Sequence, residues 1–243
     1  MRFRRVLGRL LLVAVASVSV LGSAGCARQA PVSTSESDQA ASQTSSPAPD
    51  ATAEEEGGAL FTPTYVPNGQ EVAIIKTSKG TIKVKLYGKD APINTANFIE
   101  LASKGFYDGL KFHRLEAGFV VQGGDPQTKD LSSKEVKKLV KDQKSGAYAQ
   151  GQPILGTGDP GYKVKGEFSP GNIPHKHVDG TLAMARGGDW DSAGSQFYFT
   201  LGPQTFLDGK YTVFGDAESG LDVVHELAVG DEIVSVTIEN ATK

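Results

Sequence analysis

A series of short apolar segments, separated by glycine, proline and polar turn residues, runs from Val72 to Glu239 and most constrains the fold. In Thr81–Tyr87, Ile82 and Val84 alternate with lysines, which predicts a strand with one buried and one solvated face. Many short strands joined by turn residues are typical of antiparallel sandwiches and barrels. The expected strands are Val72–Lys76, Thr81–Tyr87, Lys111–Arg114, Phe119–Gln122, Tyr162–Phe168, Thr181–Ala185, Gln196–Leu201, Thr212–Gly215 and Glu232–Glu239.

Two further segments have the apolar spacing of helices that would cover such a sheet. Asp90 is the expected cap of the first helix, Pro92 takes an early helical position, and Gly105 ends it. The second helix is expected at Ser219–Ala228, where leucines and a valine share one side. Strands and helices together predict a mainly β domain, a closed antiparallel barrel with helical caps.

A third helix is expected at Ser132–Gly146, inside a long loop that runs from Gln127 to Ile154. Ser132 and Glu135 have the spacing of a capping box, and apolar residues then recur at helical intervals until Gly146. The segment also carries five lysines. A solvated charged face accounts for these lysines, and contact with an anionic surface or an acidic client is the alternative.

Residues 1–25 have the pattern of an export signal: a basic start, an apolar stretch, and small residues before Cys26. The apolar stretch is too short and wrongly flanked for a stable membrane span. The motif LGSAGC resembles a bacterial lipobox, although Ser23 stands where leucine or valine is commoner. We therefore expect a lipoprotein signal peptide at 1–25 and lipidation at Cys26. A plain secretory signal with a chance cysteine is the alternative.

Residues 27–58 contain no aromatic residue, leucine, isoleucine or methionine, so residues 26–58 are expected to be a lipidated cysteine followed by a disordered tether. The folded domain then comprises residues 59–243, outside the cytoplasm and anchored to a membrane of the cell envelope. Its net charge is −2, because the chain totals −3 and the first 58 residues carry five arginines and six acidic residues. A near-neutral domain does not suggest nucleic acid as a partner.

Familiar catalytic motifs are missing from the chain, which has no GxSxG, HExxH or P-loop pattern. Cys26 is the only cysteine, so a lipidated chain has no thiol for a disulfide or a cysteine metal site. A spacing of two between His175 and His177 is weak evidence for a metal site, and we expect no metal and no cofactor. His113 is expected to be a hydrogen-bonded core residue, and Asp125 a turn residue after two glycines.

Five elements follow one another in a fixed order: FHRLEAGFVVQGGD from Phe112, AMAR from Ala183, GSQFYF from Gly194, FLDG from Phe206, and VFG from Val213. Their order and spacing resemble the cyclophilin family of peptidyl-prolyl cis-trans isomerases, over nearly all of residues 70–240. The resemblance implies a closed eight-stranded antiparallel barrel capped by two helices, to which this chain adds the inserted helical loop. It also implies isomerisation of Xaa-Pro peptide bonds.

By this resemblance the substrate lies in a groove on the outside of the barrel, and Arg114 is the catalytic residue. The expected substrate-binding residues form the proline pocket (Phe119, Val120, Tyr198 and Leu207), the polar wall (Gln122 and Gln196), the border before the proline (Gly156, Ala185, Arg186 and Gly187) and the far side (Phe206 and Tyr211). Some positions depart from the common family residue: Tyr198 replaces phenylalanine, Val120 methionine, Arg186 asparagine, Phe206 tryptophan and Tyr211 histidine. These departures would change substrate preference and rate.

The chemistry implied for Arg114 and Gln122 explains why both stand among apolar residues. An Xaa-Pro amide is planar, and rotation costs about 18–20 kcal/mol, so unassisted exchange takes tens to hundreds of seconds. A guanidinium aimed at the prolyl nitrogen competes for its lone pair and weakens the double-bond character. A neutral amide holds the rotating carbonyl oxygen without adding a competing charge.

The expected function is therefore a peptidyl-prolyl isomerase that assists the folding of exported proteins through an arginine donor. Its expected partners are Xaa-Pro segments of unfolded or exported proteins and, through the lipid, a membrane; the chain is expected to be a monomer. Two other classes stay open: a tethered proline-peptide binding module with little turnover, and a chaperone-like holdase. The joint presence of Arg114, Phe119 and Gln122 favours the enzyme.

Overall fold

The computed structural model describes residues 59–169, 171 and 174–240. The expected signal peptide, the lipidated Cys26 and the tether lie outside these described residues. In the described ranges, no helix combines the length and the apolar character that crossing a bilayer requires.

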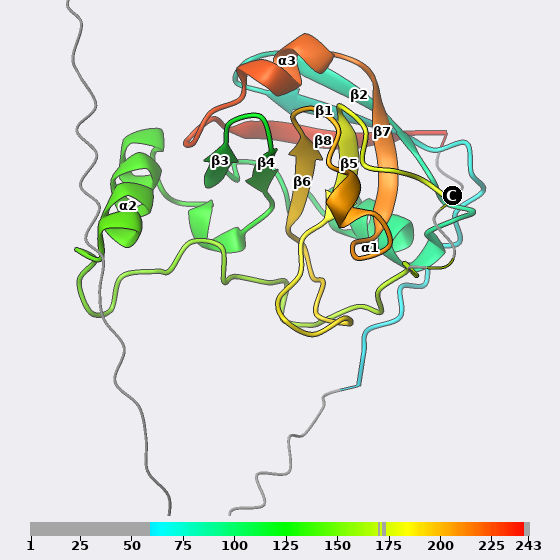
Figure 1. The fold of residues 1–243 in the computed structure, drawn as a ribbon, viewed down its shortest axis with the longest axis horizontal. Helices are drawn as coiled ribbons and strands as arrows, with labels where there is room; N and C mark the ends of the chain where they lie inside the picture. The colour runs from blue at the N-terminus through cyan, green and yellow to red at the C-terminus, as the bar shows by residue number, and fades with distance from the viewer. Residues whose placement is uncertain (1–58, 170, 172–173, 241–243) are drawn as a thin grey trace, which may run out of the picture. The chain divides into compact units, whose positions relative to one another are not determined.

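Eight antiparallel strands form one curled sheet in the order β3-β4-β6-β5-β7-β2-β1-β8 (Figure 1). Register shifts interrupt three of the strand pairs and help the sheet to bend. The strands are β1 (Val72–Thr77), β2 (Thr81–Leu86), β3 (Arg114–Glu116), β4 (Val120–Gly123), β5 (Thr181–Met184), β6 (Phe197–Thr200), β7 (Val213–Ser219) and β8 (Ile233–Glu239).

The expectation of a closed barrel is wrong, because the sheet is an open half-barrel whose end strands are β3 and β8. Within the described residues, one isolated bridge, Lys111 to Glu232, and backbone hydrogen bonds beside it link the chain before β3 with the start of β8. The N–H groups of Phe112 and Ile233 make the hydrogen bonds of this bridge, and the N–H of Lys111 donates to the Thr128 hydroxyl instead. The expected strand at Lys111–Arg114 is reduced to this bridge, and β3 begins only at Arg114.

The expected strand at Tyr162–Phe168 is also wrong, since only Val164 forms a bridge there, with Ala193. Side chains take the place of a strand partner: the N–H of Gly166 donates to Asp191, and the N–H of Glu167 donates to the Thr212 hydroxyl. Such side-chain partners satisfy the backbone without a ladder, and sequence periodicity does not reveal them.

Helix α1 (Pro92–Ser103) forms where a helix was expected, but Asp90 does not cap it. The carboxylate of Glu167 instead accepts hydrogen bonds from the N–H groups of Ile93 and Asn94, both at 2.8 Å. Asp90 contacts His175 at 2.9 Å. A residue more than seventy positions away in sequence thus supplies the anion at the helix N-terminus.

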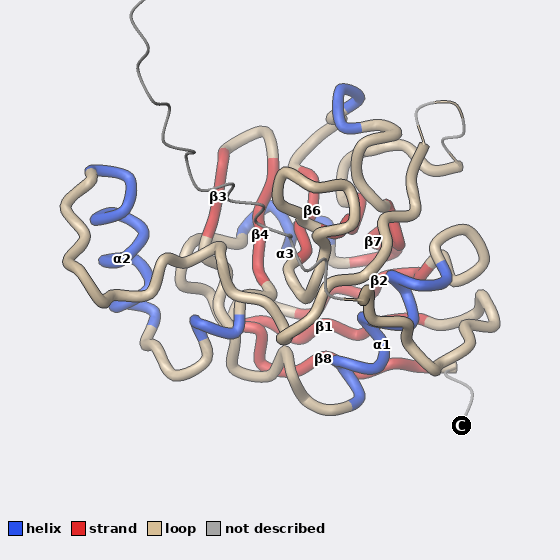
Figure 2. The backbone as a smooth tube through the Cα atoms, turned by 90° about the horizontal axis from the view of Figure 1, so that it is seen from below, coloured by secondary structure: helices blue, strands red, loops and turns tan. Residues whose placement is uncertain are grey.

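Helix α2 (Ser133–Ser145) confirms the inserted helix, with the expected capping box between Ser132 and Glu135 and a left-handed Gly146 at its end. It lies beside β3 (Figure 2), and its apolar side packs Val136 and Leu139 against the domain. Helix α3 (Leu221–Glu226) is shorter than expected, because β7 continues to Ser219 and Gly220 is left-handed.

The two faces of the sheet bury different clusters. The inner face packs Phe98, Tyr107, Phe112, Phe197 and Phe214 into a core that is closed to solvent. The outer face carries a smaller cluster of Val120, Ala183, Tyr198, Leu207 and Val213. Alternation along β6 sends Phe197 and Phe199 inward and Tyr198 outward, as the sequence predicts.

Candidate active site

A row of side chains crosses the outer face of the sheet. The strand register pairs Arg114 with Gln122, Gln122 with Tyr198, and Tyr198 with Ala183. Directly paired positions of antiparallel strands point to the same face. Residues far apart in sequence are therefore brought together by the register of β3, β4, β6 and β5.

A cavity of about 150 Å³, here called the proline pocket, opens beside this row. Its size suits one small ring rather than a whole ligand, since sites for drug-sized molecules are about 300–1,000 Å³. Aliphatic and aromatic residues make up most of its lining, and Arg114, Gln122 and Arg186 add charged and amide groups. It is lined by Arg114, Phe119, Val120, Gln122, Ala185, Arg186, Tyr198, Leu207 and Tyr211.

Arg114 is held loosely enough to remain a donor. Its Nη1 donates to Oε1 of Gln122 at 3.3 Å, and its Nε lies 3.8 Å from the Glu116 carboxylate. The guanidinium also lies 5.8 Å from the ring centroid of Phe119. With 44% of its side chain exposed, Arg114 faces the pocket mouth rather than a buried ion pair.

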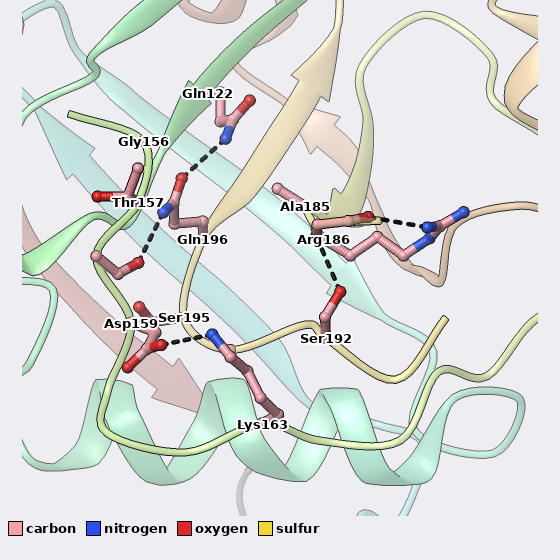
Figure 3. A pocket seen from close by; sticks show the side chains of 13 residues that line it. Gln122, Gly156, Thr157, Asp159, Lys163, Ala185, Arg186, Ser192, Ser195 and Gln196 are labelled. Carbon is pink, nitrogen blue, oxygen red and sulfur yellow. Dashed lines mark hydrogen bonds and ion pairs between the residues drawn. The ribbon is translucent and has the colours of Figure 1, made fainter. Parts of the chain in front are cut away.

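A chain of amides orients the wall behind Arg114. Gln122 donates through Nε2 to Gln196 at 2.9 Å, and Gln196 donates to the carbonyl of Gly158 at 2.7 Å (Figure 3). Each amide is thereby assigned a direction, and the carbonyl oxygen of Gln122 is turned toward Arg114. A second N–H of Gln122 stays available for a ligand.

A second cavity of about 290 Å³, the upstream pocket, adjoins the first and shares Gln122, Ala185 and Arg186 with it (Figure 3). Lys163 and Asp159 form an ion pair on its wall. The guanidinium of Arg186 donates to backbone carbonyls, including that of Lys210. The guanidinium carbon of Arg186 also lies 5.0 Å from the ring centroid of Trp190, and these contacts stiffen the rim of the upstream pocket.

The structure brings together nearly all residues expected from the sequence. The proline pocket contains Phe119, Val120, Gln122, Ala185, Arg186, Tyr198, Leu207 and Tyr211, and the upstream pocket contains Gly156, Gly187 and Gln196. Phe206 is the exception, because it lines neither cavity. It is 59% exposed and stacks on Phe119 with centroids 5.5 Å apart, at the outer rim.

A histidine behind the pocket escaped the sequence reasoning. The ring of His177 is fully buried, and its Nε2 lies 3.0 Å from the Tyr198 hydroxyl. Its Nδ1 lies 3.0 Å from Asp208, which directly follows the pocket residue Leu207. These hydrogen bonds connect the pocket wall on β6 with the loop that follows it. No local pattern predicts them, because the partners lie 21 and 31 positions from His177.

His113 is buried as expected, but it is not the hydrogen-bonded core residue that the sequence suggested. Neither ring nitrogen has a well-formed partner among the described residues, although Gln196 and Lys111 lie nearby. Burial lowers its pKa, while the charge of Asp125 opposes that shift. His113 is therefore neutral at neutral pH and is not poised as an acid.

Asp125 is a turn residue, as predicted, and it also joins the two ends of the inserted segment. Its fully buried carboxylate accepts hydrogen bonds from the N–H of Gln127, at 2.8 Å, and from the N–H of Gly156. Gly156 borders the upstream pocket. The carboxylate of Asp125 thus holds both ends of the insertion, at Gln127 and Gly156, in place beside the site.

We expect the free energy of unfolding to fall as the pH drops below about 6.5. Burial lowers the pKa of His113 and of His177 in the folded chain, so the unfolded chain binds protons first. Their contribution is complete above the unfolded pKa and declines by up to about 1.4 kcal/mol per pH unit for each histidine. Urea unfolding between pH 7.5 and 5.0 measures the slope.

Carboxylates with a lowered pKa, such as Glu71 and Glu100, lose their contribution only below about pH 4.5, so this window reports the histidines. His177→Gln should reduce the slope. A stability that does not change between pH 7.5 and 5.0 would contradict the assignment.

Comparison with known proteins identifies relatives for most of the described domain. A sequence model of the family described as "Cyclophilin type peptidyl-prolyl cis-trans isomerase/CLD" matches residues 72–243. A peptidyl-prolyl cis-trans isomerase of Synechococcus elongatus is 40% identical over 168 residues, which cover 68% of this chain and 94% of that protein. Peptidyl-prolyl cis-trans isomerase B of Bacillus subtilis is 40% identical over 158 residues, covering 65% of this chain and 90% of that protein.

Solved structures show the same fold. A cyclophilin type peptidyl-prolyl cis-trans isomerase of Cryptosporidium parvum, crystallised in the presence of the dipeptide Ala-Pro, has a TM-score of 0.54 and 23% identity. The match covers 70% of this chain and 99% of that chain. A cyclophilin from Hirschia baltica has a TM-score of 0.51 and covers 71% of this chain and 75% of that one.

Proposed function

Because the chain belongs to the cyclophilin-type peptidyl-prolyl cis-trans isomerase family and is an enzyme of that type, we propose that Arg114 is its catalytic donor. In this proposal an Xaa-Pro segment lies across the outer face of the sheet, with its proline ring in the proline pocket. The residues before the proline lie toward the upstream pocket. The observation that carries the proposal is the row Arg114–Gln122–Tyr198 beside a cavity of about 150 Å³.

The proposed mechanism requires no proton transfer and no covalent intermediate. The guanidinium of Arg114 donates toward the prolyl nitrogen, whose lone pair becomes available as the amide twists out of plane. The free N–H of Gln122 holds the rotating carbonyl oxygen, and the chain through Gln196 to Gly158 keeps that amide in place. Donors that are already oriented stabilise the twisted state without reorganising during the reaction.

The direct test measures cis-trans exchange of an Ala-Pro peptide by NMR, with and without the protein. We expect exchange much faster than the uncatalysed rate, which is on the order of 0.01 per second. A peptide that binds to the proline pocket without any gain in its exchange rate would support a binding module. A peptide that does not bind would remove the assignment of the pocket altogether.

We further propose that the enzyme is a lipoprotein of the cell envelope and assists the folding of exported proteins as a monomer. The motif LGSAGC, which ends at the single cysteine of the chain, supports lipid attachment. A composition that lacks large apolar residues at 27–58 supports a tether that holds the domain away from the membrane. Unfolded exported chains would then be the nearest source of Xaa-Pro segments.

Cys26→Ser is expected to move the protein from the membrane fraction to the soluble fraction of its native host. Two or more acyl chains anchor a protein stably, and the substitution removes their attachment site. Fractionation followed by immunoblotting measures the change, and Ser23→Ala serves as the control. A membrane fraction that is unchanged in Cys26→Ser would exclude acylation as the anchor.

A further inference from the structure

Helix α2 forms one wall of a cavity next to Arg114. This cavity of about 300 Å³ lies between α2 and β3 and has Arg114 and Gln122 in common with the proline pocket. Lys144 of α2 reaches Glu116 at 3.4 Å, and the same carboxylate oxygen lies 3.8 Å from Nε of Arg114. The inserted helix therefore borders the proposed catalytic group through one shared contact.

A second depression of about 460 Å³ lies along α2 and shares Val140 and Lys144 with the first. Val140 and Val229 form its half-buried apolar floor, and lysines stand around the floor. We call the two depressions together the α2 groove. Its helix residues are Lys137, Val140, Lys141, Gln143, Lys144 and Ser145.

The groove has a net positive charge, because Arg114 and three lysines of α2 line it against one carboxylate, that of Glu116, and the acidic groups of α2 are engaged elsewhere. Glu135 accepts from Ser132 in the capping box, and Asp142 is paired with Lys138 at 2.6 Å. Among residues 59–169, 171 and 174–240, no carboxylate lies within ion-pair distance of Lys137 or Lys141. A generally solvated helix face would mix both signs, whereas here the lysines gather at an apolar floor.

The helix is also seated firmly enough to present these lysines in a fixed place. Val136 and Leu139 are buried against Leu155, and the capping box and the left-handed Gly146 define its two ends. Gly230 approaches so closely that a Cβ there would lie 2.8 Å from the carbonyl of Ser133. The groove is therefore a formed surface and not a mobile arm.

We propose that the α2 groove binds the client segment next to the Xaa-Pro pair and selects segments in which acidic residues flank an apolar residue. The proposal rests on the function proposed for Arg114 and its pocket. Charge complementarity favours glutamate or aspartate beside Lys141 and Lys144, and the floor at Val140 accepts an aliphatic side chain. Two adjoining depressions, the first of which shares Arg114 and Gln122 with the proline pocket, suit a polypeptide better than a flat lipid surface.

The test compares peptides that carry Glu-Leu-Glu beside Ala-Pro, on the amino or carboxyl side, with the matching Gln-Leu-Gln peptides. The whole chain is used in a Cys26→Ser background, so that no acyl chain interferes. We expect kcat/KM to be about 5- to 10-fold higher for the better placed acidic peptide at low salt, with the ratio approaching one above about 0.5 M salt. Dissociation constants are measured beside exchange rates.

Two variants assign the preference to the groove. The double variant Lys141→Gln, Lys144→Gln should reduce the ratio below about 2. Lys138→Gln removes a charge from the same helix but lies outside the groove, and it should keep the ratio of the parent. If Lys138→Gln reduces the ratio of kcat/KM values as much as the double variant does, the preference is a general charge effect and the proposal is overturned.

Other results also decide the question. Equal kcat/KM values and equal dissociation constants for the acidic and amide peptides would overturn the proposal while leaving the isomerase intact. If no peptide is isomerised, the function proposed for Arg114 fails, and the ratio of dissociation constants alone tests the groove. Binding to vesicles is measured with 30% phosphatidylserine. If the protein shows no peptide preference but binds these vesicles through Lys141 and Lys144, the surface belongs to a membrane instead.

Discussion

Arg114→Ala is expected to lower the catalysed exchange rate of a bound Xaa-Pro peptide about a hundredfold, which corresponds to roughly 2.7 kcal/mol of transition-state stabilisation. The hydrogen bond from a guanidinium strengthens as the prolyl nitrogen becomes pyramidal, so its loss raises the barrier more than it weakens binding. The fold should survive, because the side chain is half-exposed on the outer face of β3 and the core residue Phe112 is untouched.

The measurement pairs NMR exchange at saturating peptide with the dissociation constant. Arg114→Lys is the matched variant, and it should recover little activity because an ammonium lacks the planar fork. Glu116→Gln controls for the ion pair at 3.8 Å and should retain most of the rate. An Arg114→Ala variant with the exchange rate of the parent would remove Arg114 from the mechanism. Lost affinity with an unchanged saturated rate would favour the binding module.

Asp125→Ala is expected to lower the free energy of unfolding by about 2–4 kcal/mol, because hydrogen bonds to a charged group contribute about 1.5–3 kcal/mol each. The substitution leaves the N–H groups of Gln127 and Gly156 without their common acceptor. Gly156 would then be free to shift at the border of the upstream pocket, and KM should rise more than kcat falls.

Urea unfolding gives the stability of this variant, and hydrogen exchange should show faster opening in residues 127–156. Asp125→Asn keeps one carbonyl acceptor in the same place and should lose about half as much stability. The control is Asp130→Ala, a substitution at an exposed carboxylate just inside the insertion. A loss of less than about 0.5 kcal/mol in Asp125→Ala would show that the insertion closes without this clamp.

Local patterns in the chain predicted that three helices form and which faces of the strands are buried, although two expected strands and the extent of α3 were wrong. The alternation Phe197, Tyr198, Phe199 assigns one face to the core and the other to the pocket, and the structure agrees. The Ser132–Glu135 box and Gly146 delimit α2 as written in the sequence. These features depend on residues a few positions apart, so the interactions that produce them lie within one short stretch of sequence.

The ordered motifs from Phe112 to Gly215 went further, since their resemblance to one family named all nine residues that line the proline pocket. Of the thirteen residues that line the upstream pocket, it named six. Phe206 shows the limit of that approach. It falls at a matching position, yet the backbone after Gln204 turns its ring onto Phe119 at the rim. A motif transfers the identity of a position and not the direction of its side chain.

Contacts between distant segments decided the rest. Glu167 rather than Asp90 caps α1, and side chains replace a ladder at Gly166. The sheet stays open, with β3 and β8 as its end strands. His177 reaches Tyr198 and Asp208, and Lys144 reaches Glu116 beside Arg114, across 21 to 31 positions of chain. Each donor or acceptor had several possible partners in the unfolded chain, and only close packing of the sheet and α2 selected one of them.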